Sequence, residues 1–292
     1  MNNVKCKKYF RPETLLELKD FLKNTSENVS YIAGGTDLIL HAREKDIYEN
    51  NIIVDIFNLK ELKGIKEEGD KIVIGAGATH TDVEQSDIVN KYAKVLALAC
   101  RSVGSVLIRN HSTLCGNICN ASPAGDSLSS LAVLGAKLRV LRDDKIIELD
   151  FFDVIDKPEV NKLQNKDLVV EIVINKLDEN VKCDFFKLGR RKALAISRMT
   201  ISTICKTDES GNVVLFNITC GATFPKPMTF EDVNNILIGK KPSKELIDEV
   251  AKKLSDKIPE IAGIRKSTAY KQPVCEKMVK RVLSKMLLNE EV

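Results

Sequence analysis

The sequence predicts an α+β protein, because its apolar residues change between helical and strand spacing several times along the chain. Near the start they recur every three or four residues, as in an amphipathic helix, at Leu15, Leu18, Phe21 and Leu22. Short apolar runs bounded by polar residues or glycine follow, as is typical of strands. The length of 292 residues and the hydrophobic share of 43% fit two or three small globular domains.

The first part of the chain is expected to begin with a helix from Pro12 to about Asn24, since proline fits the first turn of a helix. Further strands are expected at 29–33, 52–54, 72–74, 138–141 and 169–174, and further helices from Leu38 and over 87–100. Residues 104–126 are so polar and so rich in turn residues that they are not expected in the core.

A second domain is expected over residues 177–292, after a first domain of residues 1–176. Its strands are expected at 182–188, 199–205 and 213–220, and its helices at 243–256 and 274–288. Since no internal repeat or low-complexity linker separates the two domains, we expect them to pack closely.

The composition excludes several classes of protein. With 45 Lys+Arg, 41 Asp+Glu and no tryptophan, the chain lacks the basic, base-stacking surface of a nucleic-acid-binding protein. No signal-peptide pattern is visible, and no stretch approaches the ~20 apolar residues of a membrane span, so a cytoplasmic protein is predicted. The eight cysteines are then expected to be unpaired, mostly as small buried residues.

Two glycines stand between an expected strand and an expected helix, in the segment Ile32-Ala33-Gly34-Gly35-Thr36-Asp37-Leu38. Without Cβ atoms the chain can turn sharply and let a phosphate approach backbone N–H groups, and the helix N-terminus adds a favourable dipole. Thr36 can also donate its hydroxyl. The alternative is a tight turn in which Asp37 caps the helix.

A second segment, Ser112-Thr113-Leu114-Cys115-Gly116-Asn117, gathers neutral hydrogen-bond donors ahead of Asp126. Such groups suit a diphosphate or the polar edge of a flavin ring, and Asp126 can accept from hydroxyl or amide donors. Arg109 and His111 can add positive charge. The alternative is a polar surface loop with a turn at 120–123 and with Asp126 as the cap of the next helix.

Together these segments resemble the FAD-binding subunit of the xanthine dehydrogenase and carbon monoxide dehydrogenase family of molybdenum hydroxylases. The similar stretches are residues 33–38, 108–110, 115–118, 121–126, 186–196, 269–271 and 279–283. The resemblance thus spans nearly the whole chain. It implies a two-lobed FAD-binding domain of the vanillyl-alcohol-oxidase-like (PCMH) type, with lobes at about 1–56 and 57–176. An α+β C-terminal domain, as in the carbon monoxide dehydrogenase flavoprotein, would follow.

The resemblance also implies which residues contact FAD. Residues 32–38 would wrap the diphosphate, residues 112–116 would contact the cofactor from the other side, and Lys187 would approach from the C-terminal domain. The full set is Ile32, Ala33, Gly34, Gly35, Thr36, Asp37, Leu38, Val103, Ser112, Thr113, Leu114, Cys115, Gly116, Asn117, Asp126 and Lys187. No residue is expected to be catalytic, because the flavin itself performs the redox chemistry.

The same resemblance implies two partner subunits. A [2Fe–2S] subunit would deliver electrons, and a molybdopterin subunit would hydroxylate a purine, another heterocycle or an aldehyde. The reduced flavin would pass a hydride to NAD⁺ or another acceptor. Two other functions stay open: an assembly scaffold that holds little flavin, and a free-standing FAD oxidoreductase.

Cys115 departs from the family pattern, which usually has two consecutive glycines where this chain has Cys115-Gly116. A side chain must then fit where the backbone normally lies against the cofactor. The consequence is either weaker binding with a shifted loop, or a small side chain that is tolerated.

Other motifs point to functions that we do not expect. Gly75-Ala76-Gly77 follows an apolar run, but His80 stands where a dinucleotide fingerprint needs its third small residue. Cys115 and Cys119 lack the close-set pairs of iron–sulfur ligands, and three histidines give little support for a zinc site. The basic residues over 252–285 form either a solvated helix face or a contact with a partner subunit.

Overall fold

The computed structural model describes residues 5–44, 46 and 48–290, and its first lobe is a three-stranded parallel sheet with strand order β1-β3-β2. The elements of this lobe are β1 (Lys8–Phe10), α1 (Leu15–Asn24), β2 (Val29–Ile32), α2 (Leu38–Glu44) and β3 (Ile52–Asp55). α1 begins at Leu15 rather than at Pro12, because the side chain of Thr14 caps it by accepting from the N–H of Glu17.

The second lobe is a five-stranded antiparallel sheet with strand order β4-β5-β10-β6-β7. Its strands are β4 (Ile65–Glu68), β5 (Lys71–Gly75), β6 (Lys137–Arg142), β7 (Lys145–Asp150) and β10 (Leu168–Asn175), preceded by the 3₁₀ turn η1 (Lys60–Leu62). Six short helices connect β5 to β6: α3 (His80–Gln85), α4 (Asp87–Tyr92), α5 (Lys94–Arg101), α6 (Val106–Arg109), α7 (Leu114–Asn120) and α8 (Asp126–Val133). After β7 come α9 (Phe151–Val154), β8 (Ile155–Lys157) and β9 (Val160–Asn161).

The C-terminal part is a three-stranded antiparallel sheet with two long helices on one face. Its strands are β11 (Lys182–Gly189), β12 (Ser197–Thr207) and β13 (Val213–Gly221), and its helices are α10 (Glu231–Asn234), α11 (Lys244–Ala262) and α12 (Thr268–Leu283), followed by a π-helical turn η2 (Ser284–Leu288). The predicted boundary near residue 177 falls in the segment between β10 and β11, and the division into domains stays a prediction. The α+β class is confirmed.

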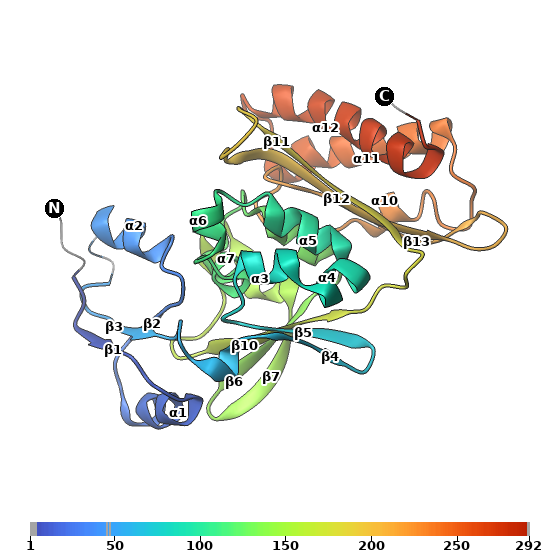
Figure 1. Ribbon diagram of the computed structural model, residues 1–292. Helices are drawn as coiled ribbons and strands as arrows, with labels where there is room; N and C mark the ends of the chain where they lie inside the picture. Colours follow the sequence, from blue (N-terminus) through green and yellow to red (C-terminus); the bar gives the residue numbers. More distant parts are fainter. Residues whose placement is uncertain (1–4, 45, 47, 291–292) are drawn as a thin grey trace.

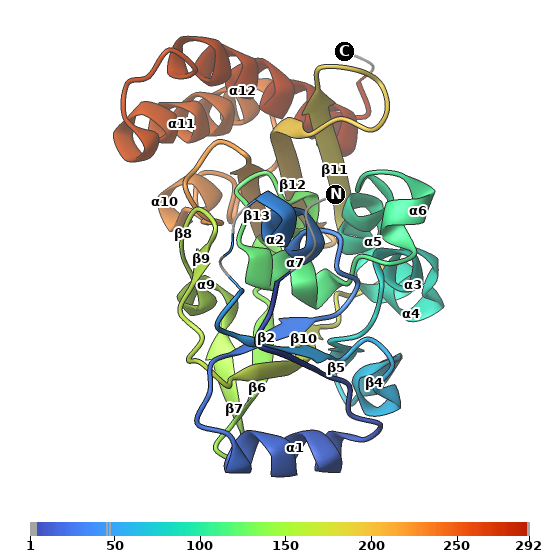
Figure 2. The same ribbon diagram turned by 90° about the vertical axis from the view of Figure 1, so that its left-hand side faces the viewer.

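The elements stack in layers. In Figure 1 the helices α3–α5 lie between the five-stranded sheet below and strands β11–β13 above, and α11 and α12 cover the outer face of those strands. Figure 2 shows α1 at the opposite end of the molecule from α11 and α12, with α2 in front of α7. One core lies between the five-stranded sheet and helices α3–α5, α7 and α8, and it reaches Ile204 on β12. The C-terminal layer therefore closes over the helices of the second lobe.

The structure corrects two expectations. The helix expected over 87–100 is two helices, because the backbone at Ala93 leaves the helical region. Residues 104–126 were not expected in the core, yet they form α6 and α7, and Leu114 and Ile118 are fully buried. Their polar residues cap helices or line a cavity, so the apolar residues between them can pack inward.

Two further observations concern classes that the sequence analysis excluded. β5, which carries Gly75 at its end, pairs antiparallel with both of its neighbours, so the Gly-x-Gly motif has no βαβ context and the exclusion of a Rossmann site is confirmed. Within the described ranges, no helix combines the length and the hydropathy needed to cross a bilayer.

Candidate functional site

A cavity of about 710 Å³ lies where the three parts of the chain meet. Its walls come from the segment between β2 and α2, from α7 and the turn before it, from the N-terminus of α8, and from β11 with the turn that follows it. The volume lies within the range of roughly 300–1,000 Å³ of small-molecule and cofactor sites.

The first glycine segment packs directly on the second. A Cβ atom built on Gly34 would lie 1.8 Å from the carbonyl oxygen of His111 and 3.0 Å from the amide nitrogen of Ser112. Gly35 has a φ of +70°, in the left-handed region that glycine tolerates best. Asp37 receives a hydrogen bond of 3.3 Å from the side-chain amide of Asn120 on α7, so polar contacts also join the two segments.

The second segment is a capped helix start. Thr113 is the N-cap of α7, and its Oγ1 accepts from the N–H of Gly116 at 3.0 Å. A Cβ atom on Gly116 would lie 2.8 Å from the same Oγ1, so a side chain there would require the cap to shift. Cys115 has ordinary helical backbone and its side chain is buried in the core. The fold therefore accommodates the cysteine side chain at this position.

Polar groups link α7 to α8. Ser127 Oγ donates to the side-chain oxygen of Asn117 at 2.8 Å. A Cβ atom on Gly125, the N-cap of α8, would lie 2.9 Å from that same oxygen. The side chain of Asn117 is thus fixed at the cavity wall, because the hydrogen bond from Ser127 determines the orientation of its amide group.

An ion pair connects the first domain to the C-terminal sheet at the cavity. Lys187 Nζ on β11 contacts Asp126 Oδ2 at 2.5 Å and donates to the carbonyl oxygen of Ser102 at 2.9 Å. Ser197 on β12 donates to the other carboxylate oxygen, and Ser102 Oγ donates to Oδ2 at 3.2 Å. Because Asp126 is only 6% exposed, its charge depends on these partners.

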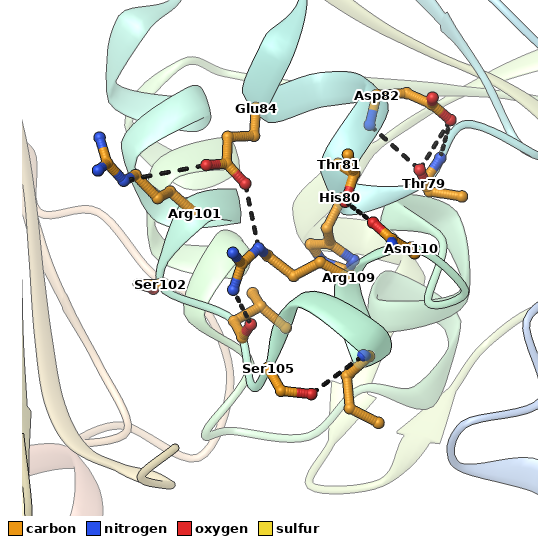
Figure 3. A network of polar contacts seen from close by, with 12 residues as sticks. Thr79, His80, Thr81, Asp82, Glu84, Arg101, Ser102, Ser105, Arg109 and Asn110 are labelled. Carbon is orange, nitrogen blue, oxygen red and sulfur yellow. Dashed lines mark hydrogen bonds and ion pairs between the residues drawn. The ribbon is translucent and has the colours of Figure 1, made fainter. Parts of the chain in front are cut away.

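Helix α3 supports the wall formed by residues 103–112 (Figure 3). Glu84 accepts from Nε of Arg109 at 3.0 Å, and the guanidinium of Arg109 also donates to the carbonyl oxygen of Val103 at 3.1 Å. Thr81 Oγ1 donates to the side-chain oxygen of Asn110 at 2.6 Å. Arg109 was expected to add positive charge for a ligand. Its charge is instead neutralised by Glu84, and its guanidinium holds the backbone at Val103.

The cavity suits FAD, an elongated ligand with an aromatic ring, a chain of hydroxyls and a diphosphate. Apolar side chains such as Val103, Ile108 and Leu168 can cover a ring, whereas Thr36 and Asn117 offer neutral polar groups. The glycine segments bring backbone close to the cavity, as an anionic diphosphate requires.

Fifteen of the sixteen residues expected at the site line this cavity. The exception is Leu114, which is fully buried in the core at the first turn of α7. The structure adds lining residues that the sequence analysis missed, among them His80, Asn161, Leu168, Val169, Leu194 and Ile196. They belong to no motif typical of a cofactor site. The folding of α3, β9, β10 and the turn between β11 and β12 brings them to the cavity.

Two protein families match this chain. Residues 3–176 match the family described as the FAD binding domain in molybdopterin dehydrogenase, and residues 184–286 match the family described as the CO dehydrogenase flavoprotein C-terminal domain. The nicotinate dehydrogenase FAD-subunit of Eubacterium barkeri is 31% identical over 284 residues, which are 96% of this chain and 95% of that protein. The glyceraldehyde dehydrogenase medium chain of Sulfolobus acidocaldarius is 28% identical and is covered to 93%. Further relatives are named for xanthine, caffeine, nicotine and carbon monoxide enzymes.

Solved structures share the fold at lower identity. Carbon monoxide dehydrogenase from Oligotropha carboxidovorans superposes with a TM-score of 0.88 at 20% identity, over 99% of this chain and all of the matched chain. Quinoline 2-oxidoreductase from Pseudomonas putida 86 has a TM-score of 0.87, also at 20% identity, over 98% of this chain and 99% of the matched one. These likenesses show that the chain shares the fold of those structures.

Proposed function

Because this chain belongs to the FAD-binding medium subunits of the molybdenum hydroxylase family, we propose that it holds one FAD between its two glycine segments and relays electrons through it. A [2Fe–2S] subunit supplies the electrons, and NAD⁺ or another acceptor removes them. The observation that carries this proposal is that residues 32–38 and 112–117, about 80 positions apart in the chain, form facing walls of one cavity.

The residues of this chain bind and orient the cofactor. Residues 32–38 hold the diphosphate, and the capped start of α7 contacts the cofactor from the other side. Asp126 and Lys187 place a carboxylate and an ammonium at the cavity wall, where they orient polar groups of the ligand. When bound, the flavin supplies the electron and hydride transfer. The apolar wall around Val103 keeps water from the ring.

We further propose that the complex hydroxylates a nitrogen heterocycle in the cytoplasm. The support is that the names of several relatives refer to nicotinate, xanthine, caffeine or nicotine. Under this proposal the substrate binds in the molybdopterin subunit, and the present chain takes no part in choosing it.

The test is to purify the chain alone and together with the products of neighbouring genes, and to record the flavin absorbance bands and the cofactor released on denaturation. One FAD per chain is expected, with flavin reduction when the assembled complex receives nicotinate or xanthine. A chain that holds no FAD in either preparation would refute the proposal. NADH oxidation by the isolated chain would instead favour a free-standing oxidoreductase.

A further inference from the structure

The backbone at His111 and Ser112 is a wall shared by both glycine segments. Gly34 lies against it from the first segment, at the distances given above, and Thr113 continues it into α7. A hydrogen bond of 2.7 Å from the N–H of Ser112 to the carbonyl oxygen of Ile108 closes the preceding turn. Any displacement of Ser112 would therefore move both walls of the cavity.

His80 on α3 holds Ser112 through two donors. Its backbone N–H donates to the carbonyl oxygen of Ser112 at 3.0 Å, and its ring Nδ1 lies 2.9 Å from the same oxygen and 3.0 Å from Ser112 Oγ. An antiparallel bridge between Thr79 and Thr113 extends this contact. The ring is completely buried at the edge of the cavity.

The surroundings of the ring determine which nitrogen carries the proton. Nε2 is buried and has no hydrogen-bond partner among the described residues. An N–H at that position would be a buried unsatisfied donor, and a bare Nδ1 would face a carbonyl oxygen. The Nδ1–H tautomer avoids both costs. Burial lowers the pKa of His80, which keeps the ring neutral.

We propose that His80 is a positioning residue of the cofactor site: its Nδ1–H fixes the carbonyl of Ser112 and thereby sets the separation of the two glycine segments. This inference rests on the proposed function, because the site that it orders is the FAD site. His80 acts from α3, the same helix that holds Arg109 and Asn110 through Glu84 and Thr81 (Figure 3).

The test compares His80→Leu, His80→Asn and the matched control Val83→Ala in the full-length chain. Val83 is a fully buried residue of the same helix whose side chain does not line the cavity, so its truncation reports a general loss of α3 packing. Asparagine places an N–H near the position of Nδ1, whereas leucine fills similar space without a donor. FAD affinity is measured by flavin fluorescence on titration.

We expect His80→Leu to weaken FAD binding at least tenfold, His80→Asn to stay within about threefold of the parent, and Val83→Ala to lower the melting temperature without a change in affinity. Equal losses in His80→Leu and His80→Asn, native affinity in His80→Leu, or an equal loss in Val83→Ala would each overturn the inference.

Hydrogen–deuterium exchange of the FAD-free chain separates this inference from the proposed function. His80→Leu should speed exchange in peptides covering 33–38 and 108–117, and His80→Asn should not. If the parent binds no FAD, the proposed function fails, and the exchange result alone decides whether His80 orders the two segments. Unchanged exchange in His80→Leu would reject the positioning role.

Discussion

Gly34 lies so close to the carbonyl oxygen of His111 that a Cβ atom on Gly34 would be 1.8 Å from that oxygen. From the sequence alone, this glycine is expected to let a phosphate approach the backbone. The structure gives a different reason, because the space that a side chain would need is occupied by the second segment. Gly34 is thus required for the two segments to meet, before any ligand is considered.

Gly34→Ala should therefore separate the two walls of the cavity. Since the methyl group meets backbone atoms rather than the end of a flexible side chain, the segments must move apart, at a cost of about 1–3 kcal/mol in the free energy of unfolding. FAD affinity should fall at least tenfold in the same fluorescence titration.

Gly69→Ala is the control: Gly69 is in the β4–β5 turn with a φ of +62° and open space around it. It should lose about 1 kcal/mol of stability through backbone strain and keep its affinity. Equal affinity in both variants would contradict the steric explanation.

Regular elements with a clear apolar period could be predicted from the sequence. The strands that became β5, β6, β10 and β11–β13 and the helix that became α1 were found within about three residues of their bounds. The two long C-terminal helices were also found, but α11 continues to Ala262 rather than ending at 256, and α12 begins at Thr268 rather than at 274. Short or half-exposed elements were missed, among them α3, α6, β4 and β8, because they offer too few residues for a period to appear. The break at Ala93 was also missed, since the apolar spacing runs on across it.

The candidate site could be predicted where a residue type has a local signature. Glycine pairs, hydroxyl clusters and Asp126 are visible as motifs, and nearly all of them line the cavity. His80 carries no such signature. It follows the Gly75-Ala76-Gly77 motif, which the sequence analysis considered only as a dinucleotide-binding fingerprint and excluded. Its role appears only when α3 and the turn before α7, 32 positions apart, are seen to share hydrogen bonds. Local sequence contains no information about such pairings.

The ion pair between Asp126 and Lys187 should couple the two domains energetically. Lys187→Met leaves a carboxylate that is 6% exposed with only hydroxyl donors, which should cost about 2–4 kcal/mol in urea unfolding of the FAD-free chain. Asp126→Asn removes the charge and retains part of the hydrogen bonding. The double variant should be more stable than the sum of the single losses predicts, by about 1–3 kcal/mol. Additive losses would mean that the two side chains contribute independently.

Cys115→Gly tests the hypothesis of a scaffold that holds little flavin. That hypothesis requires the glycine variant to gain FAD, because the cysteine would obstruct the cofactor. The structure predicts no gain, since Cys115 has ordinary helical backbone and, although it lines the cavity, its side chain is only 7% exposed and packs on the core. Glycine should instead lower the stability by about 1–3 kcal/mol, through lost burial and a less favourable helix residue. Occupancy is read from the ratio of flavin to protein absorbance, and a clear rise in Cys115→Gly would support the scaffold after all.

The buried His80 should make the stability of the chain depend on pH below neutrality. Burial lowers its pKa in the folded state from the ordinary value of 6.5; the hydrogen bond to Ser112 and the charges of Asp126 and Asp37 oppose this shift, and Arg109 adds to it. Near pH 6.5 and just below it, His80 therefore binds a proton in the unfolded chain but not in the folded chain. Stability from this group is complete above pH 6.5 and falls as the pH drops, by up to about 1.4 kcal/mol per pH unit, until the folded-state pKa is reached.

His80→Asn removes this titration and should keep the hydrogen bond to Ser112, so it isolates the contribution. Carboxylates with a lowered pKa, such as Glu68 and Asp232, titrate below this window and act alike in both proteins. Urea unfolding at pH 7.5, 6.5 and 5.5 should show a steeper loss of stability in the parent than in the variant, with the difference confined to the acidic side of pH 6.5. Parallel curves would mean that the pKa of His80 is the same in the folded and the unfolded chain. That result would contradict a buried imidazole that stays neutral.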